Sequence, residues 1–104
     1  MEILEQAVSQ HSARSQLGVT LLKYGQLLGR DGYQPDAIGR FDEAIKVFQR
    51  LIADQPKMPS HPHNLAWVHE ERAHVLIELE RFKEARADLN ECLKAWEPLT
   101  ASLV

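Results

Sequence analysis

One six-residue pattern occurs twice in this chain, and it constrains the fold more than any other feature. Residues 39–44 read GRFDEA and residues 80–85 read ERFKEA, so that Arg, Phe, Glu and Ala recur at an offset of 41 positions. Each copy opens an apolar pattern of helical spacing, and the two runs end near Pro56 and Pro98. Self-similarity at a period of roughly 20–50 residues is typical of repeat proteins, whose units cannot bury their apolar faces alone. We therefore expect stacked helical units.

The composition is that of a folded domain without a nucleic-acid footprint. Hydrophobic residues make up 44% and charged residues 26% of the 104 positions, close to the averages for globular proteins. The net charge is −3, with six basic and seven acidic residues in 1–56 and six and eight in 57–104. Nucleic-acid binding needs a basic patch or stripe, which this even distribution does not provide.

The same sequence gives no membrane or secretion signal. No apolar run approaches the length of a membrane span, and residues 1–5 lack the basic start and apolar middle of a signal peptide. The single cysteine, Cys92, cannot form an internal disulfide, which is compatible with a reducing compartment. We expect a cytoplasmic protein that does not bind membranes.

The first helical stretch covers residues 2–28 and can be read in two ways. Its stripe is interrupted around His11, where Ser12 could cap a second helix. The absence of Pro or Gly before Gly18 favours one continuous helix. The apolar residues at three-to-four spacing are Ile3, Leu4, Ala7, Val8, Leu17, Leu21, Leu22 and Leu28.

A turn at residues 29–35 leads to the second helix, and Pro35 suits its first helical position. That helix ends at residues 54–56. Pro56, Pro59 and Pro62 then predict a stiff, extended linker over residues 55–63. The amphipathic stripe of the second helix consists of Phe41, Ala44, Ile45, Phe48, Leu51 and Ile52.

Two more helices are expected after the linker. The third begins near residues 62–64 and runs to Glu80, and the fourth runs from about Phe82 to Trp96, where Pro98 stops it. Residues 99–104 are expected to be frayed or a short cap. The predicted buried side of the third helix is Leu65, Val68, Ala73, Leu76 and Leu79; that of the fourth is Phe82, Ala85, Leu89, Cys92, Leu93 and Trp96.

These features resemble the tetratricopeptide repeat (TPR), a helix–turn–helix unit with small, aromatic and proline residues at set positions. In the first repeat Leu51 replaces a small residue, and in the second Leu89 stands where an aromatic is usual and Pro98 lies one place late. The positions that match are Gly18, Ala44, Phe48 and Pro56 in the first repeat and Ala73, Ala85 and Cys92 in the second.

The spacing departs from the minimal repeat. Gly18 and Ala44 lie 26 residues apart, whereas Ala73 and Ala85 lie 12 apart, so the first pair must have an extended first helix. The linker is about seven residues longer than the minimal unit. It resembles that of longer TPR variants such as kinesin light chain, in which a His-Pro pair also occurs; here the pair is His61–Pro62.

The resemblance implies an all-α fold of TPR-like α-solenoid type, with antiparallel helix pairs in one domain over residues 1–104. Repeat 1 covers about residues 12–56 and repeat 2 about residues 64–98. Residues 1–11 are either a helical extension or the remnant of a preceding repeat, because Leu4 and Ala7 fall at aromatic-then-small spacing. Phe48 is expected to fill the space between the units, and Ala44 and Ala85 to permit close helix approach.

In the TPR family the ligand lies in a concave groove lined by the first helix of each pair. The residues carried over by position are Ser12, Ser15, Gln16, Val19, Leu22 and Lys23, then Trp67, Glu70, Glu71, His74, Ile77 and Glu78. A tryptophan among carboxylates suits a protein or peptide with basic and apolar residues, since Trp is a favoured hot-spot residue. The alternative is that the glutamates form a solvated face and Trp67 packs against the first repeat.

Other chemistries are excluded or unsupported. Some TPR proteins grip a terminal carboxylate with Lys, Asn and Arg, but the matching positions hold Ser15, Val19 and Glu71, so a carboxylate would meet a like charge. His69 and His74 are five apart, about 140° around a helix, and do not form the His-Glu-x-x-His zinc pattern. We interpret the histidines as isolated surface residues and Cys92 as a small buried hydrophobe.

We therefore expect no catalytic, cofactor-binding or metal-binding residues, and a non-enzymatic module that binds a partner peptide or helix. An alternative is a homo-oligomerisation unit or a regulatory segment of a larger repeat protein. Two repeats leave apolar ends uncovered, which favours a homodimer through those ends. A third alternative is an enzyme or metal protein built on a helical bundle.

Overall fold

Four helices make up the described part of the chain. The computed structural model describes the backbone of residues 2–101 and the side chains of residues 10–96. The helices are α1 (Glu2–Arg30), α2 (Gln34–Asp54), α3 (Ser60–Glu78) and α4 (Phe82–Ala101), and no strand occurs within residues 2–101. The expected all-α class is confirmed.

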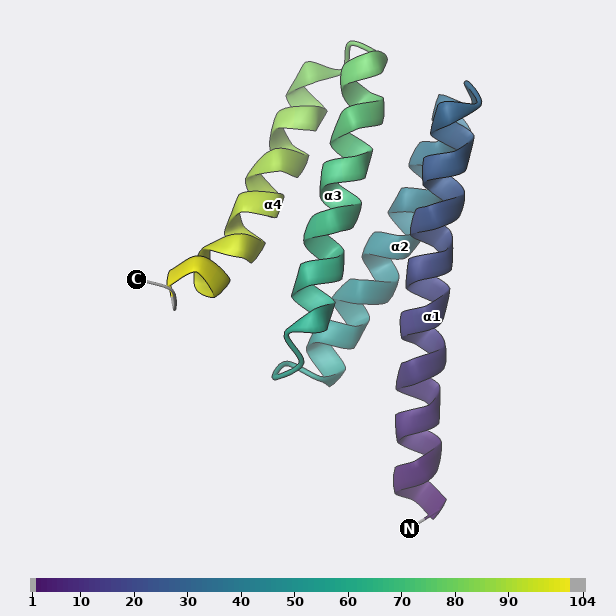
Figure 1. Cartoon of the computed structure of the whole chain (residues 1–104), viewed down its shortest axis with the longest axis vertical. Helices are drawn as coiled ribbons and strands as arrows, with labels where there is room; N and C mark the ends of the chain where they lie inside the picture. Colours follow the sequence, from purple (N-terminus) through teal and green to yellow (C-terminus); the bar gives the residue numbers. More distant parts are fainter. Residues whose placement is uncertain (1, 102–104) are drawn as a thin grey trace.

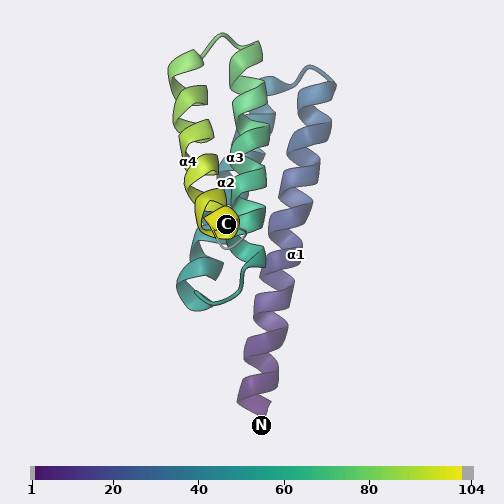
Figure 2. The ribbon, with the colours of Figure 1, turned by 60° about the vertical axis from the view of Figure 1, so that its left-hand side comes forward.

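Consecutive helices run antiparallel and form two hairpins (Figure 1). α1 packs on α2 and α3 packs on α4, while the hairpins join through α2 and α3 and through a smaller contact between α1 and α3. The turned view in Figure 2 shows the same side-by-side order, with α3 between α4 and α1. The molecule measures 50 × 35 × 17 Å, so it is a slab of two stacked helix pairs with an extended first helix.

The first hairpin is held by aromatic rings seated on glycines. A Cβ added to Gly18 would lie 2.5 Å from the ring of Phe48, and one added to Gly25 would lie 2.5 Å from the ring of Phe41. A seven-residue step forward along α1 thus matches a seven-residue step backward along α2. A Cβ added to Gly29 would lie 3.9 Å from Ala37 Cβ, which continues the same antiparallel register. Only the absence of a side chain on α1 lets these rings lie flush with the helix.

A single apolar core runs through all four helices. It is built from large side chains such as Leu22 of α1 and Leu76 of α3, together with small residues where helices approach closely. The predicted small positions Ala44, Ala73 and Ala85 are all buried. The core comprises Leu22, Ala37, Ile38, Phe41, Ala44, Phe48, Leu51, Val68, Ala73, Val75, Leu76 and Ala85, with Leu65 and Leu79 partly buried against it.

The first two helices agree with the sequence pattern, with small shifts at their ends. α1 is one continuous helix, so the alternative break at Ser12 is wrong. It continues to Arg30, which shortens the predicted turn to residues 31–33, where Gly32 has a positive φ of 89°. α2 begins at Gln34 with Pro35 in its first turn and ends at Asp54, as predicted.

The predicted extended linker over residues 55–63 is wrong in its second half. α3 already begins at Ser60, and the connection over residues 55–59 contains turns. Pro62, which the sequence places at the end of the linker or at the start of the third helix, lies in the first turn of α3. Backbone N–H groups in a first turn have no intrahelical acceptor, so a proline there costs no hydrogen bond. The end of α3 at Glu78 is two residues earlier than expected, before Glu80 adopts a φ of 61°.

The fourth helix differs from the prediction at its end and on its face. α4 passes through Pro98 and ends at Ala101, because a proline removes a single hydrogen bond and the helix can resume after a bend. Figure 1 shows the last, yellow turns of α4 leaving the direction of the earlier ones. Of the expected cap at residues 99–104, residues 99–101 are helical and residues 102–104 lie outside the described range.

The predicted buried face of α4 is only partly buried. Ala85 is buried and Cys92 and Trp96 are half-buried, but Phe82, Leu89 and Leu93 are 59%, 41% and 62% exposed. The reason is the position of α4 at the edge of the stack, where it packs against α3. One neighbouring helix covers only part of the wide apolar arc of α4, and the rest of the arc remains in solvent.

Candidate functional site

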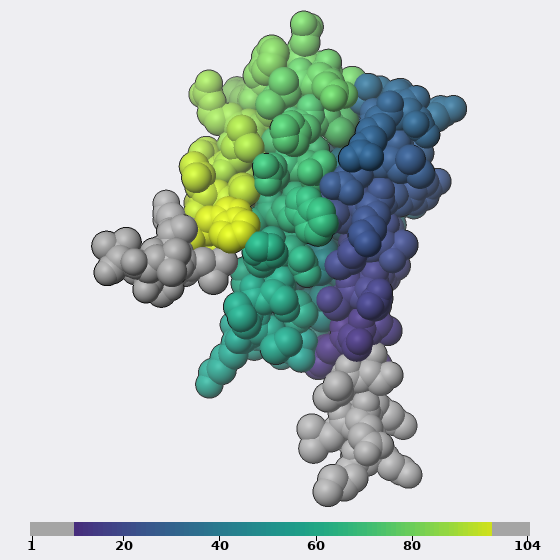
Figure 3. Space-filling view, in the orientation of Figure 1, coloured from purple at the N-terminus to yellow at the C-terminus, as the bar shows by residue number. Residues whose placement is uncertain are grey.

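The groove between α1 and α3 contains two hollows. These helices are the first members of the two hairpins, and they lie side by side on the face shown in Figure 3. The lower hollow, of about 270 Å³, is lined by His11, Ser12, Ser15, Gln16, Gln55, Met58, Ser60 and His61. The upper hollow, of about 100 Å³, is lined by Gln26, Gly29, Arg30, Phe41, Glu71, His74, Val75 and Glu78.

The structure divides the predicted groove residues among five environments. Ser12, Ser15 and Gln16 line the lower hollow, and Glu71, His74 and Glu78 line the upper one. Val19 and Trp67 are half-buried against the core, whereas Lys23, Glu70 and Ile77 are exposed on the helix surfaces. Leu22 is fully buried in the core, so its assignment to the groove surface is wrong: on α1 it shares the side of Gly18 and Gly25 that faces α2.

The upper hollow is acidic along α3 and tight at its floor. Glu71 and Glu78 lie seven residues apart on α3, and Glu78 accepts a 3.4 Å hydrogen bond from Gln34. Arg30 brings one positive charge from the α1 side. A Cβ at Gly29 would lie 3.3 Å from Val75 Cγ2, so this glycine keeps α1 and α3 close. The hollow therefore presents two carboxylates above an apolar floor.

The lower hollow is built around a buried, neutral histidine. His61 is 3% exposed, and its Nε2 lies 2.8 Å from Gln55 Oε1, an acceptor, so Nε2–H is the donor. Burial lowers the pKa of His61, and the nearby His11 adds to that shift. Its Nδ1 is also buried and has no hydrogen-bond partner among the described residues. The wall on the α1 side is fixed by Arg14, which donates to Asp54 at 3.2 Å.

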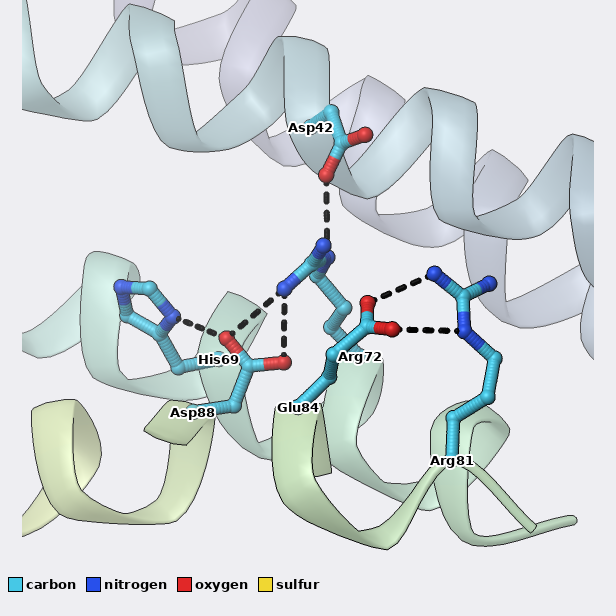
Figure 4. Close-up of polar contacts among 6 residues, drawn as sticks. All are labelled: Asp42, His69, Arg72, Arg81, Glu84 and Asp88. Carbon is cyan, nitrogen blue, oxygen red and sulfur yellow. Dashed lines mark hydrogen bonds and ion pairs between the residues drawn. The ribbon is translucent and has the colours of Figure 1, made fainter. Parts of the chain in front are cut away.

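A buried polar cluster on the opposite side of α3 joins three helices (Figure 4). Asp88 of α4 is 3% exposed and accepts from His69 Nδ1 at 2.8 Å. It also accepts from Arg72 Nη1, at 3.1 Å to Oδ1 and 2.9 Å to Oδ2. Arg72 Nε lies 2.9 Å from Asp42 Oδ1 of α2, an ion pair in which the N–H is not aligned for a hydrogen bond. The cluster thereby ties α2, α3 and α4 together.

The interpretation of the histidines as isolated surface residues is wrong for His61 and His69. His61 and His69 are buried and paired, and only His63 and His74 among the four on α3 are exposed. One sequence signal points to the cluster: Asp88 falls between Ala85 and Cys92 on the buried side of α4. A carboxylate in that position requires a cation or donor from the facing helix.

The cluster fixes helices rather than offering reactive groups. Arg72 neutralises Asp88, and both Asp88 oxygens accept hydrogen bonds. Among residues 10–96 no group of three or more His, Cys, Asp or Glu side chains lies where it could hold a metal ion. Cys92 is a free, half-buried thiol whose pKa is raised by burial and by the charge of Glu70. Next to it, the rings of His63 and Trp96 meet edge to face at 4.6 Å and close the second hairpin.

Comparison with known proteins gives no relative for this chain. No family model, curated protein or solved structure matches it. None of the helices in the described range is long and apolar enough to cross a membrane.

Proposed function

We propose that the protein is a non-enzymatic interaction module that binds a peptide or helix with basic and apolar residues in the groove between α1 and α3. One observation carries the proposal: the first helices of both hairpins line a common groove whose α3 wall bears Glu71 and Glu78. The TPR resemblance implies a ligand at this place. Val19 of α1 and Trp67 of α3 are half-buried, and on each helix they fall in sequence between the residues that line the two hollows. They supply apolar surface for an anchor residue of the ligand.

The proposal is tested with two labelled 15-residue peptides that have leucine at the same positions. One peptide carries lysine at the remaining charged positions, and the other carries glutamate there. The lysine peptide should bind more tightly in fluorescence anisotropy. Glu71→Gln/Glu78→Gln should weaken its binding by about tenfold, because two carboxylates near the ligand are lost. Asp36→Asn/Glu43→Gln is the matched control, since it also removes two carboxylates seven residues apart on one helix, in this case exposed ones on α2. Equal binding of both peptides, or equal loss in both variants, contradicts the proposal.

A second candidate function, homo-oligomerisation, is favoured by exposed apolar residues on α1. Leu17, Tyr24 and Leu27 are each about half exposed, and they recur at seven- and three-residue steps on the side away from α2. Light scattering across concentrations tests this candidate. A mass that stays at one chain at all concentrations excludes it, and a dimer that Leu17→Ser/Leu27→Ser dissociates supports it.

The unpaired, half-buried Cys92 supports the further proposal that the protein is cytoplasmic, where thiols remain reduced.

A further inference from the structure

The outer face of α4 carries an apolar stripe with the spacing of a coiled-coil seam. Phe82, Arg86, Leu89 and Leu93 follow one another at steps of four, three and four residues. At about 100° per residue they fall within an arc of about 60° on the helix. All four are exposed, and α4 packs against α3 through the neighbouring side, about 90° away, which carries Ala85, Asp88 and Cys92. The stripe therefore has the geometry to receive one further helix along its length.

The charges beside this stripe are unbalanced. The three acidic residues of α4 with described side chains are all engaged within the protein: Glu84 with Arg81, Asp88 with Arg72, and Glu91 with Lys94. Arg86, within the stripe, and Lys83, which flanks it, are exposed and form no ion pair within residues 10–96. The stripe thus combines exposed apolar side chains with uncommitted positive charge.

We propose that this α4 stripe (Phe82, Arg86, Leu89 and Leu93, flanked by Lys83) docks an acidic amphipathic helix of a partner protein. Leucine-like residues of the partner would cover Phe82, Leu89 and Leu93. A glutamate or aspartate would face Arg86, because a polar residue inside an otherwise apolar seam must be paired when the seam is covered. Carboxylates on the partner's flank would lie against Lys83. A basic helix is disfavoured by like charge at both cations. This surface is separate from the groove between α1 and α3, so the inference does not depend on the groove's function.

The test uses two synthetic 21-residue helical peptides with leucine at the seam positions. The acidic peptide has glutamate on its flanks and at one seam position, and the basic peptide has lysine at the same places. All titrations use the Glu71→Gln/Glu78→Gln protein, because the groove between α1 and α3 is itself proposed to bind a basic peptide through these two carboxylates. Titration by calorimetry or anisotropy should then show that the acidic peptide binds and the basic one does not. The affinity should fall steeply as salt is raised, because exposed charges are screened.

Four variants, two tests and two controls, locate the binding and identify the charge partner. Leu93→Ser should weaken binding of the acidic peptide by about tenfold. Leu27→Ser, which replaces a similarly exposed leucine on α1, should not weaken it. Arg86→Glu should also weaken it by about tenfold and should permit binding of the basic peptide; Arg50→Glu, an exposed charge on α2, should do neither. All four substitutions are at exposed sites, and circular dichroism verifies that each variant keeps its helices.

Three outcomes would overturn the inference. The first is that neither peptide binds at concentrations up to the millimolar range. The second is that both peptides bind with equal affinity, or that Arg86→Glu changes the affinity for neither peptide. The stripe would then be an apolar surface that does not distinguish acidic from basic partners. The third is that light scattering shows a dimer that Leu93→Ser dissociates and the acidic peptide does not displace. In that case the occupant is a second copy of this chain.

Discussion

The closest contacts in the first hairpin depend on two residues that have no side chain. Gly18 and Gly25 each receive an aromatic ring from α2, and a methyl group at either position would collide with that ring at 2.5 Å. Both rings are fully buried, so they cannot swing into solvent without opening the core. The stability of this hairpin therefore depends on the lack of a Cβ atom at these two positions.

Replacing either glycine by alanine should destabilise the protein, although alanine has the higher helix propensity. Gly18→Ala and Gly25→Ala are each expected to lower the free energy of unfolding by about 1–3 kcal/mol through overpacking, even though alanine favours helix. Gly39→Ala is the control, because Gly39 lies in α2 with nothing within 4 Å of an added Cβ. It should raise the free energy of unfolding by about 0.5–1 kcal/mol. Urea denaturation measures all three, and stabilisation by Gly18→Ala would disprove the tight contact.

His61 should make stability depend on pH in a defined direction. Burial lowers its pKa in the folded protein below the ordinary value of 6.5, so the unfolded chain takes up the proton first as the pH falls. The stabilising effect of a neutral His61 is complete above about pH 6.5 and declines as the pH falls from there through the folded-state pKa. Unfolding measured between about pH 8 and 5 should show a larger loss of stability in the wild type than in His61→Gln. Equal pH dependence in both proteins would contradict this assignment.

Among the elements, α3 is the one that the polar cluster fixes to both neighbours. Arg72 reaches Asp42 on α2 and Asp88 on α4, and His69 also bonds to Asp88. These contacts act between helices that are joined in sequence only by short turns. They set the rotation of α3 about its axis, because Arg72 cannot reach both carboxylates in another orientation.

Asp88→Asn should therefore be far more costly than loss of an exposed ion pair. It removes the buried carboxylate to which His69 and Arg72 donate, and it leaves the half-buried Arg72 with only its ion pair to Asp42. We expect the free energy of unfolding to fall by about 1.5–3 kcal/mol, the range for hydrogen bonds to a charged group. Glu84→Gln is the comparison, since Glu84 pairs with Arg81 on the surface, where solvent screens the ion pair, and its loss should cost much less. Chemical denaturation checks the difference. Similar values for the two variants would show that Asp88 is not an effective partner of Arg72.

The helices themselves could be predicted from the sequence wherever the apolar period was clear. α2 has its predicted end and its predicted buried residues, from Phe41 to Leu51. The prolines were interpreted less well, because their effect depends on position within a helix: Pro62 lies in a first turn, and α4 continues beyond Pro98. The exposure of Phe82 and Leu93 could not be predicted, since it depends on α4 being at the edge of the stack.

The candidate site was predictable in outline and not in detail. Placement of α1 and α3 on one face follows from two helical hairpins, so Ser15, Gln16, Glu71, His74 and Glu78 were found. The pairing of His61 with Gln55 and of His69 with Asp88 was missed, because it requires the orientation of side chains across elements. The TPR resemblance itself stays a prediction.

On the scale of the whole molecule, the two hairpins share one core. Buried residues of all four helices, from Leu22 in α1 to Ala85 in α4, belong to a single contact cluster. Neither hairpin can separate without exposing apolar side chains of the other. The chain should therefore unfold as one cooperative unit.

This expectation can be checked with two probes, because both tryptophans lie in the second hairpin, Trp67 in α3 and Trp96 in α4. Circular dichroism follows all helices, whereas tryptophan fluorescence follows the second hairpin. The two urea transitions should coincide in midpoint and steepness. A fluorescence transition displaced from the dichroism transition would indicate that the hairpins unfold independently.

The shortest extent of the molecule is 17 Å, which leaves room for no more than two layers of helices. Every helix of the stack therefore has one side in contact with water. Exposed positions such as Lys23 and Glu70 should consequently accept other residues with little loss of stability, whereas the buried glycine, aromatic and alanine positions should not.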